Sequence, residues 1–414
     1  MPRTVLALFV LAVPPLMQGC SDVTPPRVEG AGADTAALTR GPDAALGRRT
    51  SETDLGDLGG GSSLATDINN SNVVVGWSFL ADGTQRAFRW TERSGMTDLG
   101  VLPGYTYSSA MTVTDDGRIF GISGLAGSSE QAIVMWDASG AIARLDIPLL
   151  PGASFGEPAD FNRAGNVVGW DFSDVQRAWY WSSGSGKDDI SSEAGDEGES
   201  GYASAVNEGG AVTGTTTLMC NGRRCWRPFR WHGANSYSEI GLPGGAFGVG
   251  FGINNTGAVV GWAAGSDNVQ RPYRWRGTFE WLPATTGAAF AVNSRNIAVG
   301  SGWDDVDQVP EAVAWTETGR LVELSPSTHT THAALSVNDN DLAVGWVSTA
   351  SGTATRAMLW PIANGRQRRD IGPLNLGSLL RPLLMPGAAG CVTEIDALVS
   401  RGALLSCLTR ATAR

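Results

Sequence analysis

Short apolar runs separated by glycine-rich turns recur along the middle of the chain, and three of these stretches are almost alike. They read INNSNVVVGW from Ile68, FNRAGNVVGW from Phe161 and INNTGAVVGW from Ile253. In each, a few turn-forming residues precede an apolar run, which is typical of two strands joined by a tight turn. The recurrence predicts one hairpin that is used many times.

A glycine follows the apolar run in every copy, and its position gives the period. The glycines are separated by 45, 48, 45, 47, 39 and 45 residues: Gly76, Gly121, Gly169, Gly214, Gly261, Gly300 and Gly345. Tryptophans keep the same phase: Trp90, Trp136, Trp181, Trp231, Trp275, Trp315 and Trp360. A period near ~45 residues is typical of a propeller blade and is too long for one coil of a β-helix.

Each copy divides into four short predicted strands. The first carries small residues and ends at a turn, where six copies have asparagine and the second copy has Thr114. The asparagines are Asn69, Asn162, Asn207, Asn254, Asn293 and Asn338. Asparagine suits a turn because its side chain bonds nearby backbone and tolerates left-handed dihedrals. The glycine inside the second strand predicts a bulge or a close approach of two backbones.

Seven such units leave exposed sheet edges unless the array closes into a ring. Two copies of the fourth strand flank the array, DLG at 54–56 and DIG at 370–372, which makes eight copies for seven units. One of them is predicted to latch the ring, and the sequence leaves open which. We therefore predict an all-β, seven-bladed β-propeller of four-stranded blades over 54–372. A small disulfide-linked C-terminal appendage follows over 373–414.

The N-terminus predicts export. Arg3 and the nine apolar residues of 5–13 form a signal-peptide pattern that is too short to cross a bilayer. The following LMQGC resembles the bacterial lipobox, which implies cleavage after residue 19 and a lipid on Cys20. The alternative is an ordinary secretion signal with an unrelated cysteine. Residues 20–53 lack apolar periodicity and are predicted to be a flexible tether. We expect a protein anchored to the bacterial envelope, at the outer membrane or cell surface, or else secreted.

Four cysteines remain after Cys20. Cys220 and Cys225 bracket one short segment, and Cys391 and Cys407 bracket another. Exported proteins meet oxidising conditions, so two disulfides are predicted, 220–225 and 391–407. A zinc site is the rival interpretation, but these spacings do not form a paired CxxC pattern.

The charge balance narrows the partners. The formal net charge is -11, with 41 acidic against 30 basic residues, so nucleic acid is excluded as an expected partner. We expect a monomer that contacts the membrane only through its lipid. No cofactor and no metal are predicted.

The stretch DLGDLGGGSSLATDINNSNVVVGWSFLADGTQRAFRW resembles the HAF repeat of bacterial extracellular proteins. That consensus has DLGxLGG, then IN, VVG and a His-Ala-Phe triplet before tryptophan. The resemblance implies an extracytoplasmic propeller and no particular activity. The histidine is replaced in this chain by Arg86, Arg177, Arg227, Arg271 and Arg356, by Glu311 in the sixth unit and by Ala132 in the second. Chemistry at that position is therefore not predicted.

Three sets of side chains are candidates for binding. The five arginines could form a ring for anions, but we favour a structural role at strand starts. His329 and His332 lie in a blade connection that could reach the channel mouth and ligate a metal or another ligand. They lack a third ligand, so solvated loop histidines are favoured. The acidic turns TDDG and NDND lack calcium-loop spacing and are interpreted as structural.

No GxSxG, HExxH or P-loop motif occurs. The predicted function is therefore a non-enzymatic binding or scaffold protein at the cell surface, whose partner is a protein or a glycan. The alternative is a propeller enzyme, a lyase or hydrolase, that acts on an extracellular polymer through a site assembled from loops. A third interpretation is a purely structural envelope component. Trp77, Trp170, Trp262 and Trp346 could stack on sugars if exposed, although packing is favoured.

Overall fold

The computed structural model describes the central part of the chain. It covers residues 52–362 except 129, 195–199, 221–222, 246, 266, 285, 304–309, 326–330, 350–351 and 353, and it excludes the side chains of 219, 220, 223, 245 and 303. These residues belong to a compact unit, Arg48–Leu374. A second unit, Met1–Gly47 with Asn375–Arg414, lies outside the described residues. Within the described part, no helix is long and apolar enough to cross a membrane.

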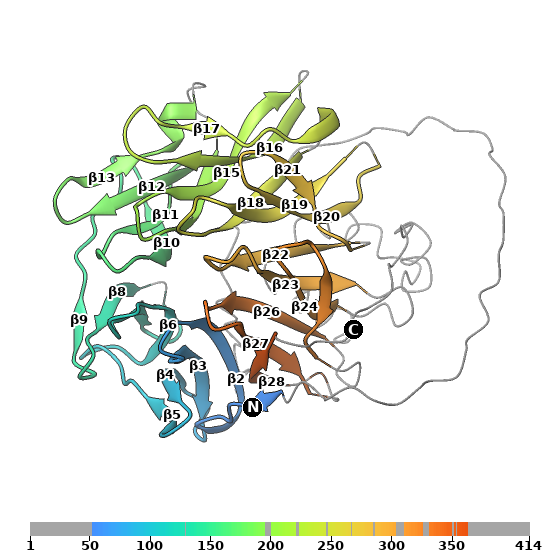
Figure 1. The fold of residues 1–414 in the computed structure, drawn as a ribbon. Coiled ribbons are helices and arrows are strands. Elements are labelled where there is room, and N and C mark those ends of the chain that lie inside the picture. Colours follow the sequence, from blue (N-terminus) through green and yellow to red (C-terminus); the bar gives the residue numbers. More distant parts are fainter. Residues whose placement is uncertain are drawn as a thin grey trace, which may run out of the picture. The chain divides into compact units, whose positions relative to one another are not determined.

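The described chain forms seven antiparallel sheets of four strands each (Figure 1). Blade 1 contains β2 (Gly59–Ile68), β3 (Val74–Leu80), β4 (Gln85–Thr91) and β5 (Gly95–Asp98). Blade 2 contains β6 (Tyr107–Val113), β7 (Ile119–Gly124), β8 (Gln131–Trp136) and β9 (Ile142–Arg144). Blade 3 contains β10 (Phe155–Phe161), β11 (Val167–Phe172), β12 (Gln176–Ser182) and β13 (Gly186–Asp189). The predicted all-β, seven-bladed propeller is confirmed.

The remaining blades repeat this order, and two short 3-10 helices lie between them. Blade 4 contains β14 (Gly201–Val206), β15 (Val212–Cys220), β16 (Arg223–Trp231) and β17 (Ser238–Glu239). Blade 5 contains β18 (Phe247–Ile253), β19 (Val259–Ala264), β20 (Gln270–Trp275) and β21 (Phe279–Trp281). Blade 6 contains β22 (Gly287–Val292), β23 (Ala298–Trp303), β24 (Pro310–Trp315) and β25 (Leu321–Glu323). Blade 7 contains β26 (His332–Val337), β27 (Leu342–Ser348), β28 (Thr355–Pro361) and β1 (Thr53–Asp54). The helices are η1 (Ser191–Ala194) and η2 (Pro243–Gly245).

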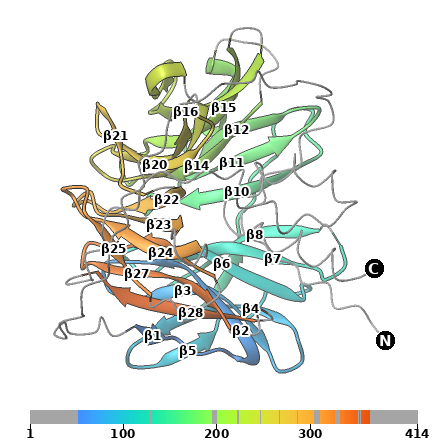
Figure 2. The same cartoon turned by 90° about the vertical axis from the view of Figure 1, so that its right-hand side faces the viewer.

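The N-terminal DLG copy latches the ring. β1 pairs with β28 as the outermost strand of blade 7, so the two ends of the array share one sheet (Figure 2). Arg356 strengthens this contact because its guanidinium binds the carboxylates of both Asp54 and Asp57. The second copy, at 370–372, lies outside the described residues.

A bulge in the first strand of every blade explains the repeated glycine. The pairing register shifts by one residue there, for example between Ala65 and Asp67 opposite β3. All seven glycines face a first-strand carbonyl oxygen so closely that a Cβ atom would lie 1.9 to 2.1 Å from it. The predicted close backbone approach is therefore confirmed, and the bulge lies in the neighbouring strand.

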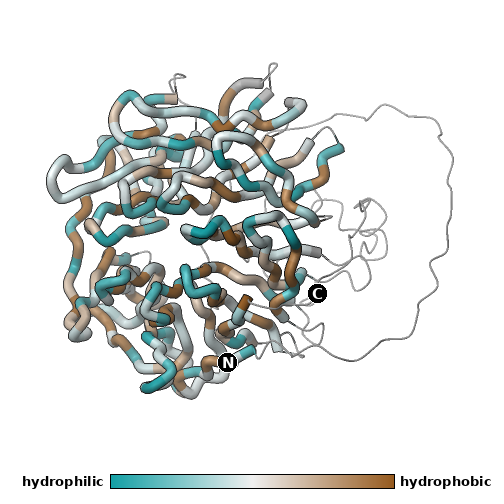
Figure 3. The backbone as a smooth tube through the Cα atoms, viewed as in Figure 1, coloured by the Kyte–Doolittle hydropathy of each residue, from teal (hydrophilic) through white to brown (hydrophobic). Residues whose placement is uncertain are grey.

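The apolar core lies between the blades. Apolar segments recur in the strands and polar turns separate them (Figure 3). The phased tryptophans Trp136, Trp231, Trp315 and Trp360 are at most 2% exposed. Such large, buried rings hold neighbouring blades together through the apolar area that they remove from water.

The turn asparagines join the blades through a ring of hydrogen bonds. In each bond, the side-chain amide donates to the backbone carbonyl of the corresponding turn residue in the next blade. The donor and acceptor pairs are Asn69–Thr114, Asn162–Asn207, Asn207–Asn254, Asn254–Asn293, Asn293–Asn338 and Asn338–Asn69, at 2.8 to 3.0 Å. The ring is interrupted only between Thr114 and Asn162 among these described positions, because threonine has no amide to donate.

This interruption lies where blades 2 and 3 meet, which we call the seam. At the seam only the inner strands β6 and β10 approach closely, whereas at every other junction an inner strand also packs against the second and third strands of its neighbour. Side chains bridge the seam instead. Phe120 stacks on Phe161 at 4.8 Å, and Thr112 donates a hydrogen bond to Asp160 at 2.9 Å.

Candidate functional site

The two faces of the ring are built from different segments. One face, the turn face, carries the short asparagine turns between first and second strands. The other, the loop face, carries the loops between second and third strands and the connections between blades. The connection from β9 to β10 spans residues 145–154, the longest of these segments that is described throughout. Long loops on a rigid scaffold are the usual carriers of binding sites.

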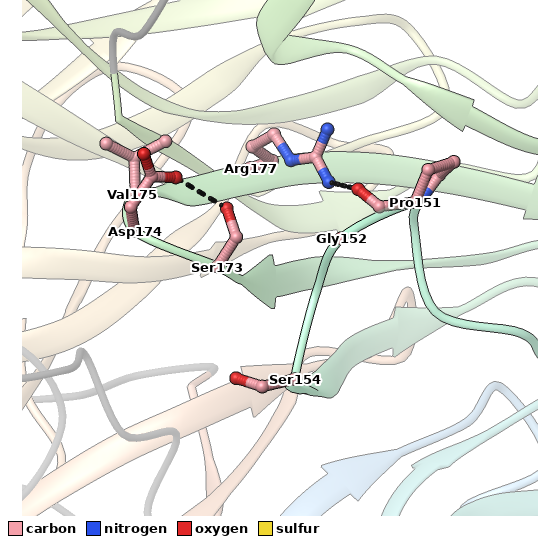
Figure 4. A pocket seen from close by; sticks show the side chains of 7 residues that line it. All are labelled: Pro151, Gly152, Ser154, Ser173, Asp174, Val175 and Arg177. Carbon is pink, nitrogen blue, oxygen red and sulfur yellow. Dashed lines mark hydrogen bonds between the residues drawn. The ribbon is translucent and has the colours of Figure 1, made fainter.

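An open pocket lies on the loop face of blade 3. Its volume is about 540 Å³, and its lining comes from the β9–β10 connection, the β11–β12 loop and the start of β12. The lining residues are Pro151, Gly152, Ser154, Ser173, Asp174, Val175 and Arg177 (Figure 4). This size is within the range of small-molecule sites.

Arg177 ties the two walls of the pocket together. Its Nη2 donates to the carbonyl of Pro151 at 2.6 Å, and its Nη1 lies 3.3 Å from Asp189. The Asp174 carboxylate accepts a hydrogen bond from the Ser173 hydroxyl, which lowers the pKa of Asp174. The pocket therefore offers hydroxyl, carbonyl and carboxylate groups, while its guanidinium charge is already balanced.

Two exposed apolar side chains lie close in sequence to the residues that line this pocket. Phe155 and Leu149 are 47% and 43% exposed, and they are two of the three large hydrophobic residues that are exposed in the described chain. The third is Trp281, at 38%. The Phe155 ring is held edge-to-face by Trp170 at 5.6 Å and contacts Phe172 at 5.3 Å. An aromatic ring fixed in this way is a ready stacking surface.

A protonatable carboxyl group lies near these rings. Glu157 is half-buried in the same inner strand, two residues after Phe155, and burial raises its pKa to about 7. Tyr107 of blade 2 is close enough that the Glu157 charge adds to the effect of burial in raising the pKa of Tyr107. A group that titrates near neutrality can exchange a proton with a bound molecule.

The seam also encloses a buried ion pair on the blade 3 side. Lys187 lies 2.7 Å from Asp171, and both side chains are at most 5% exposed. The Lys187 ammonium lies 3.9 Å from the centre of the Trp179 ring, which packs in the same apolar cluster as Phe120. The Lys187 charge is therefore stabilised both by the Asp171 carboxylate and by the Trp179 ring, and the pair is part of the packing at the seam.

His332 does not reach the channel mouth as a loop residue. It begins β26, is 1% exposed, and its Nδ1 accepts a hydrogen bond from the Ala312 N–H at 2.6 Å. Serine hydroxyls accept the matching N–H at other junctions, for example Ser108 from Ala87 and Ser63 from Ala357. The sequence placed His332 in a solvated loop because the strand begins one residue earlier than the apolar pattern shows.

Several predicted site residues cannot be placed. His329, Cys20, Cys391 and Cys407 lie outside the described residues, as does the side chain of Cys220. Cys225 is disulfide-bonded. The 220–225 and 391–407 pairings therefore remain predictions.

Four of the five repeated arginines form an ion pair within their own blade. Arg86, Arg177, Arg271 and Arg356 each pair with a carboxylate, and the partners include Asp98, Asp189, Asp267 and Asp54. Asp98, Asp189 and Asp54 are the aspartates of the fourth-strand DLG-like segments. The structural role favoured from the sequence agrees with these pairs.

The tryptophans after the repeated glycines are packing residues. Trp77, Trp170 and Trp262 are at most 4% exposed, and Trp346 is half-buried. No group of three or more metal-binding side chains occurs within the described residues.

Sequence reasoning missed Phe155, Glu157 and the pocket. One signal was available, because Glu157 breaks the repeat. Its counterparts opposite the residue after the repeated glycine are Leu64, Ser109, Tyr202, Val249, Ala288 and Ala333. A carboxylate among such residues indicates a local function.

Comparisons with known proteins support the fold alone. No family model matches the chain, and no curated protein matches it. Among solved structures, it is similar to an oligogalacturonate lyase from Vibrio parahaemolyticus, with a TM-score of 0.54 and 10% identity over 77% of this chain and 95% of that one. It also matches the propeller domain of the Trilobed protease from Pyrococcus furiosus (TM-score 0.48, 8% identity, 76% and 98% coverage). An acylaminoacyl peptidase from Pyrococcus horikoshii matches with TM-score 0.48 and 10% identity, over 78% of this chain and 54% of that one.

Proposed function

We propose that this protein is an exported, lipid-anchored propeller that binds a neutral glycan on the loop face of blade 3. The observation that carries the proposal is the exposed ring of Phe155, which directly follows Ser154, a lining residue of the open, polar pocket. A sugar ring has an apolar face of C–H groups and an edge of hydroxyl groups. It would stack on Phe155 while its hydroxyls bond with Ser154, Ser173 and Asp174.

A protein partner is less well supported. A stable protein interface needs roughly 800 Å² per partner with an apolar centre. Exposed large hydrophobic side chains in the described chain are few, and only Leu149 and Phe155 belong to blade 3 and the connection that precedes it. Isolated rings between polar groups suit a sugar better than such a centre.

Charge favours a neutral glycan over an acidic one. The chain carries a net charge of -11. Asp174 has a lowered pKa and is ionised at neutral pH, and the Arg177 charge is balanced by Asp189. A polyanion would therefore meet net repulsion at this site.

Affinity gel electrophoresis tests the proposal. The mature protein would be run through gels containing galactomannan, xyloglucan or hydroxyethylcellulose, with polygalacturonate as the acidic comparison. We expect retardation by a neutral polymer and its loss in Phe155→Ala. Trp281→Ala is the matched control, because Trp281 is also exposed and also held edge-to-face, at 4.8 Å from Phe279. Equal retardation of the two variants would contradict the assignment.

The proposed lipid anchor and the predicted disulfides have their own tests. Mass spectrometry of the mature protein should find lipid-modified Cys20 at the N-terminus. Peptides that still contain residues 17–19 joined to Cys20 would refute the lipoprotein assignment. Non-reducing peptide mapping of the same sample should link Cys220 with Cys225 and Cys391 with Cys407.

The enzyme alternative is supported by Glu157. A carboxyl group with a pKa of about 7 beside the proposed sugar site has the property of a general acid. A lyase or hydrolase would release new ends from the polymer that is bound. An assay for reducing ends would detect this activity, and Glu157→Gln should then abolish turnover while binding remains. Binding without turnover in the wild type would leave the binding function alone.

A further inference from the structure

The aromatic arrangement of blade 3 recurs in blade 5. Phe155 and Phe247 each begin an inner strand and face the third residue after the repeated glycine, Phe172 and Ala264. Phe155 meets Trp170 at 5.6 Å with an interplanar angle of 84°, and Phe247 meets Trp262 at 6.0 Å with an angle of 87°. The two pairs are therefore copies of one geometry at the same level of the ring.

Blade 5 adds a third ring to this pair. Trp226 of β16 is half-buried and lies 6.3 Å from Phe247 and 6.0 Å from Trp262, edge-to-face with both. Phe247 is half-buried as well, so both rings keep part of their surface open. Trp262 is 2% exposed, and its indole N–H is buried without a hydrogen-bond partner.

The remaining positions at this level separate the mouth into two halves. The inner strands touch one another around the ring, so the residues at this level of each blade encircle the channel mouth on the loop face. The corresponding residues are Tyr107, Phe155 and Phe247 in blades 2, 3 and 5, and Ser62, Ser200, Thr286 and Thr331 in blades 1, 4, 6 and 7. Blades 2, 3 and 5 therefore carry the aromatic side chains, and Ser200 of blade 4 leaves a gap between the rings of Phe155 and Phe247.

We propose that Phe247 with Trp226 forms a second sugar subsite, so that the protein binds an internal segment of an extended neutral polysaccharide. The segment lies across the loop face from Phe155 to Phe247 and passes the Ser200 hydroxyl of blade 4. This inference rests on the proposed function and adds the form of the ligand. Two separated stacking surfaces select a long chain over a single terminal sugar, because only a long chain engages both at once.

A series of oligosaccharides of increasing length tests the second subsite. They would be prepared from the neutral polysaccharide that retards the protein in the gel. Isothermal titration with wild-type protein should show affinity rising in two steps as the chain lengthens. Phe247→Ala should remove the second step and weaken long chains about tenfold, while short oligosaccharides bind as before. Phe247→Tyr keeps the ring and should retain both steps, which guards against a folding defect in the alanine variant. Trp281→Ala is the exposed control.

The outcomes separate the two proposals. Wild-type binding that depends on Phe155 but is unchanged in Phe247→Ala at every length would overturn the second subsite and leave the proposed function standing. No retardation of the wild type by any neutral polymer would overturn both. A single step in affinity for the wild type would also contradict an extended site.

Discussion

At the scale of single residues, the inner strands place carboxyl groups where ionisation is unfavourable. Asp160 accepts hydrogen bonds from Thr112 and the Val206 N–H, yet burial raises its pKa to about 7. Burial raises the pKa of Asp67 in the same way. These two groups bridge neighbouring blades, so their protonation belongs to the stability of the ring. Glu157 differs because no such bridge explains its position.

Glu157 gives a pH-dependent prediction. Its pKa is about 7 when folded against 4.5 ordinarily, so the native state binds more protons in that interval. Stability should therefore fall as pH rises from about 4.5 to 7, by at most about 3 kcal/mol. The side chain of the Glu157→Gln variant cannot ionise, so this variant should lose less stability over the same pH interval. Urea unfolding at pH 5 and pH 8 measures the difference, and equal losses in wild type and variant would contradict a buried, titrating Glu157. Asp67 and Asp160 contribute equally to both proteins and cancel.

At the scale of strands, the repeated glycine is required by the bulge opposite it. A Cβ on Gly300 would lie 2.0 Å from the Ala288 carbonyl oxygen. We expect Gly300→Ala to destabilise the protein by about 2–3 kcal/mol, because backbone must move to admit the methyl group. Gly302 in the same strand is the matched control. Its nearest neighbour would be a Val313 methyl group at 3.4 Å, so Gly302→Ala should change the free energy of unfolding little. Equal midpoints of denaturation would contradict the close approach.

The strands were predictable because each repeated residue is required by the local backbone conformation. Gly76 and its copies meet the bulge, and Asn69 and its copies meet the turn. The latch was not predictable, because 54–56 and 370–372 have the same local pattern and only the pairing of β1 with β28 distinguishes them. His332 was misplaced for a related reason. Its Nδ1 accepts the hydrogen bond that a serine hydroxyl accepts in other blades, and this equivalence is seen by comparing blades and not by inspecting the neighbouring residues.

At the scale of the molecule, the candidate site depends on which blades are adjacent. In the sequence, Phe155 cannot be distinguished from the other aromatic residues of the strands. Its exposure is seen only when the blades are assembled. The same is true of Phe247, whose likeness to Phe155 depends on strand register. The substitution of threonine for asparagine at 114 was visible in the sequence. Its consequence, an interrupted ring of hydrogen bonds at the seam, needed the order of blades in space.

The seam provides the last prediction. Thr114→Asn should allow a side-chain amide to donate to the Asn162 carbonyl, as Asn69 and its copies do at the other junctions. One added hydrogen bond should stabilise the protein by about 1 kcal/mol and slow hydrogen exchange in β6 and β10 more than in other inner strands. The reverse change, Asn207→Thr, makes the same interruption between blades 4 and 5, where the strands pack closely. It should lower stability and speed exchange in β14 and β18. If Thr114→Asn alters neither quantity while Asn207→Thr alters both, then the seam is held by its side-chain bridges alone and the missing amide at 114 has no energetic role.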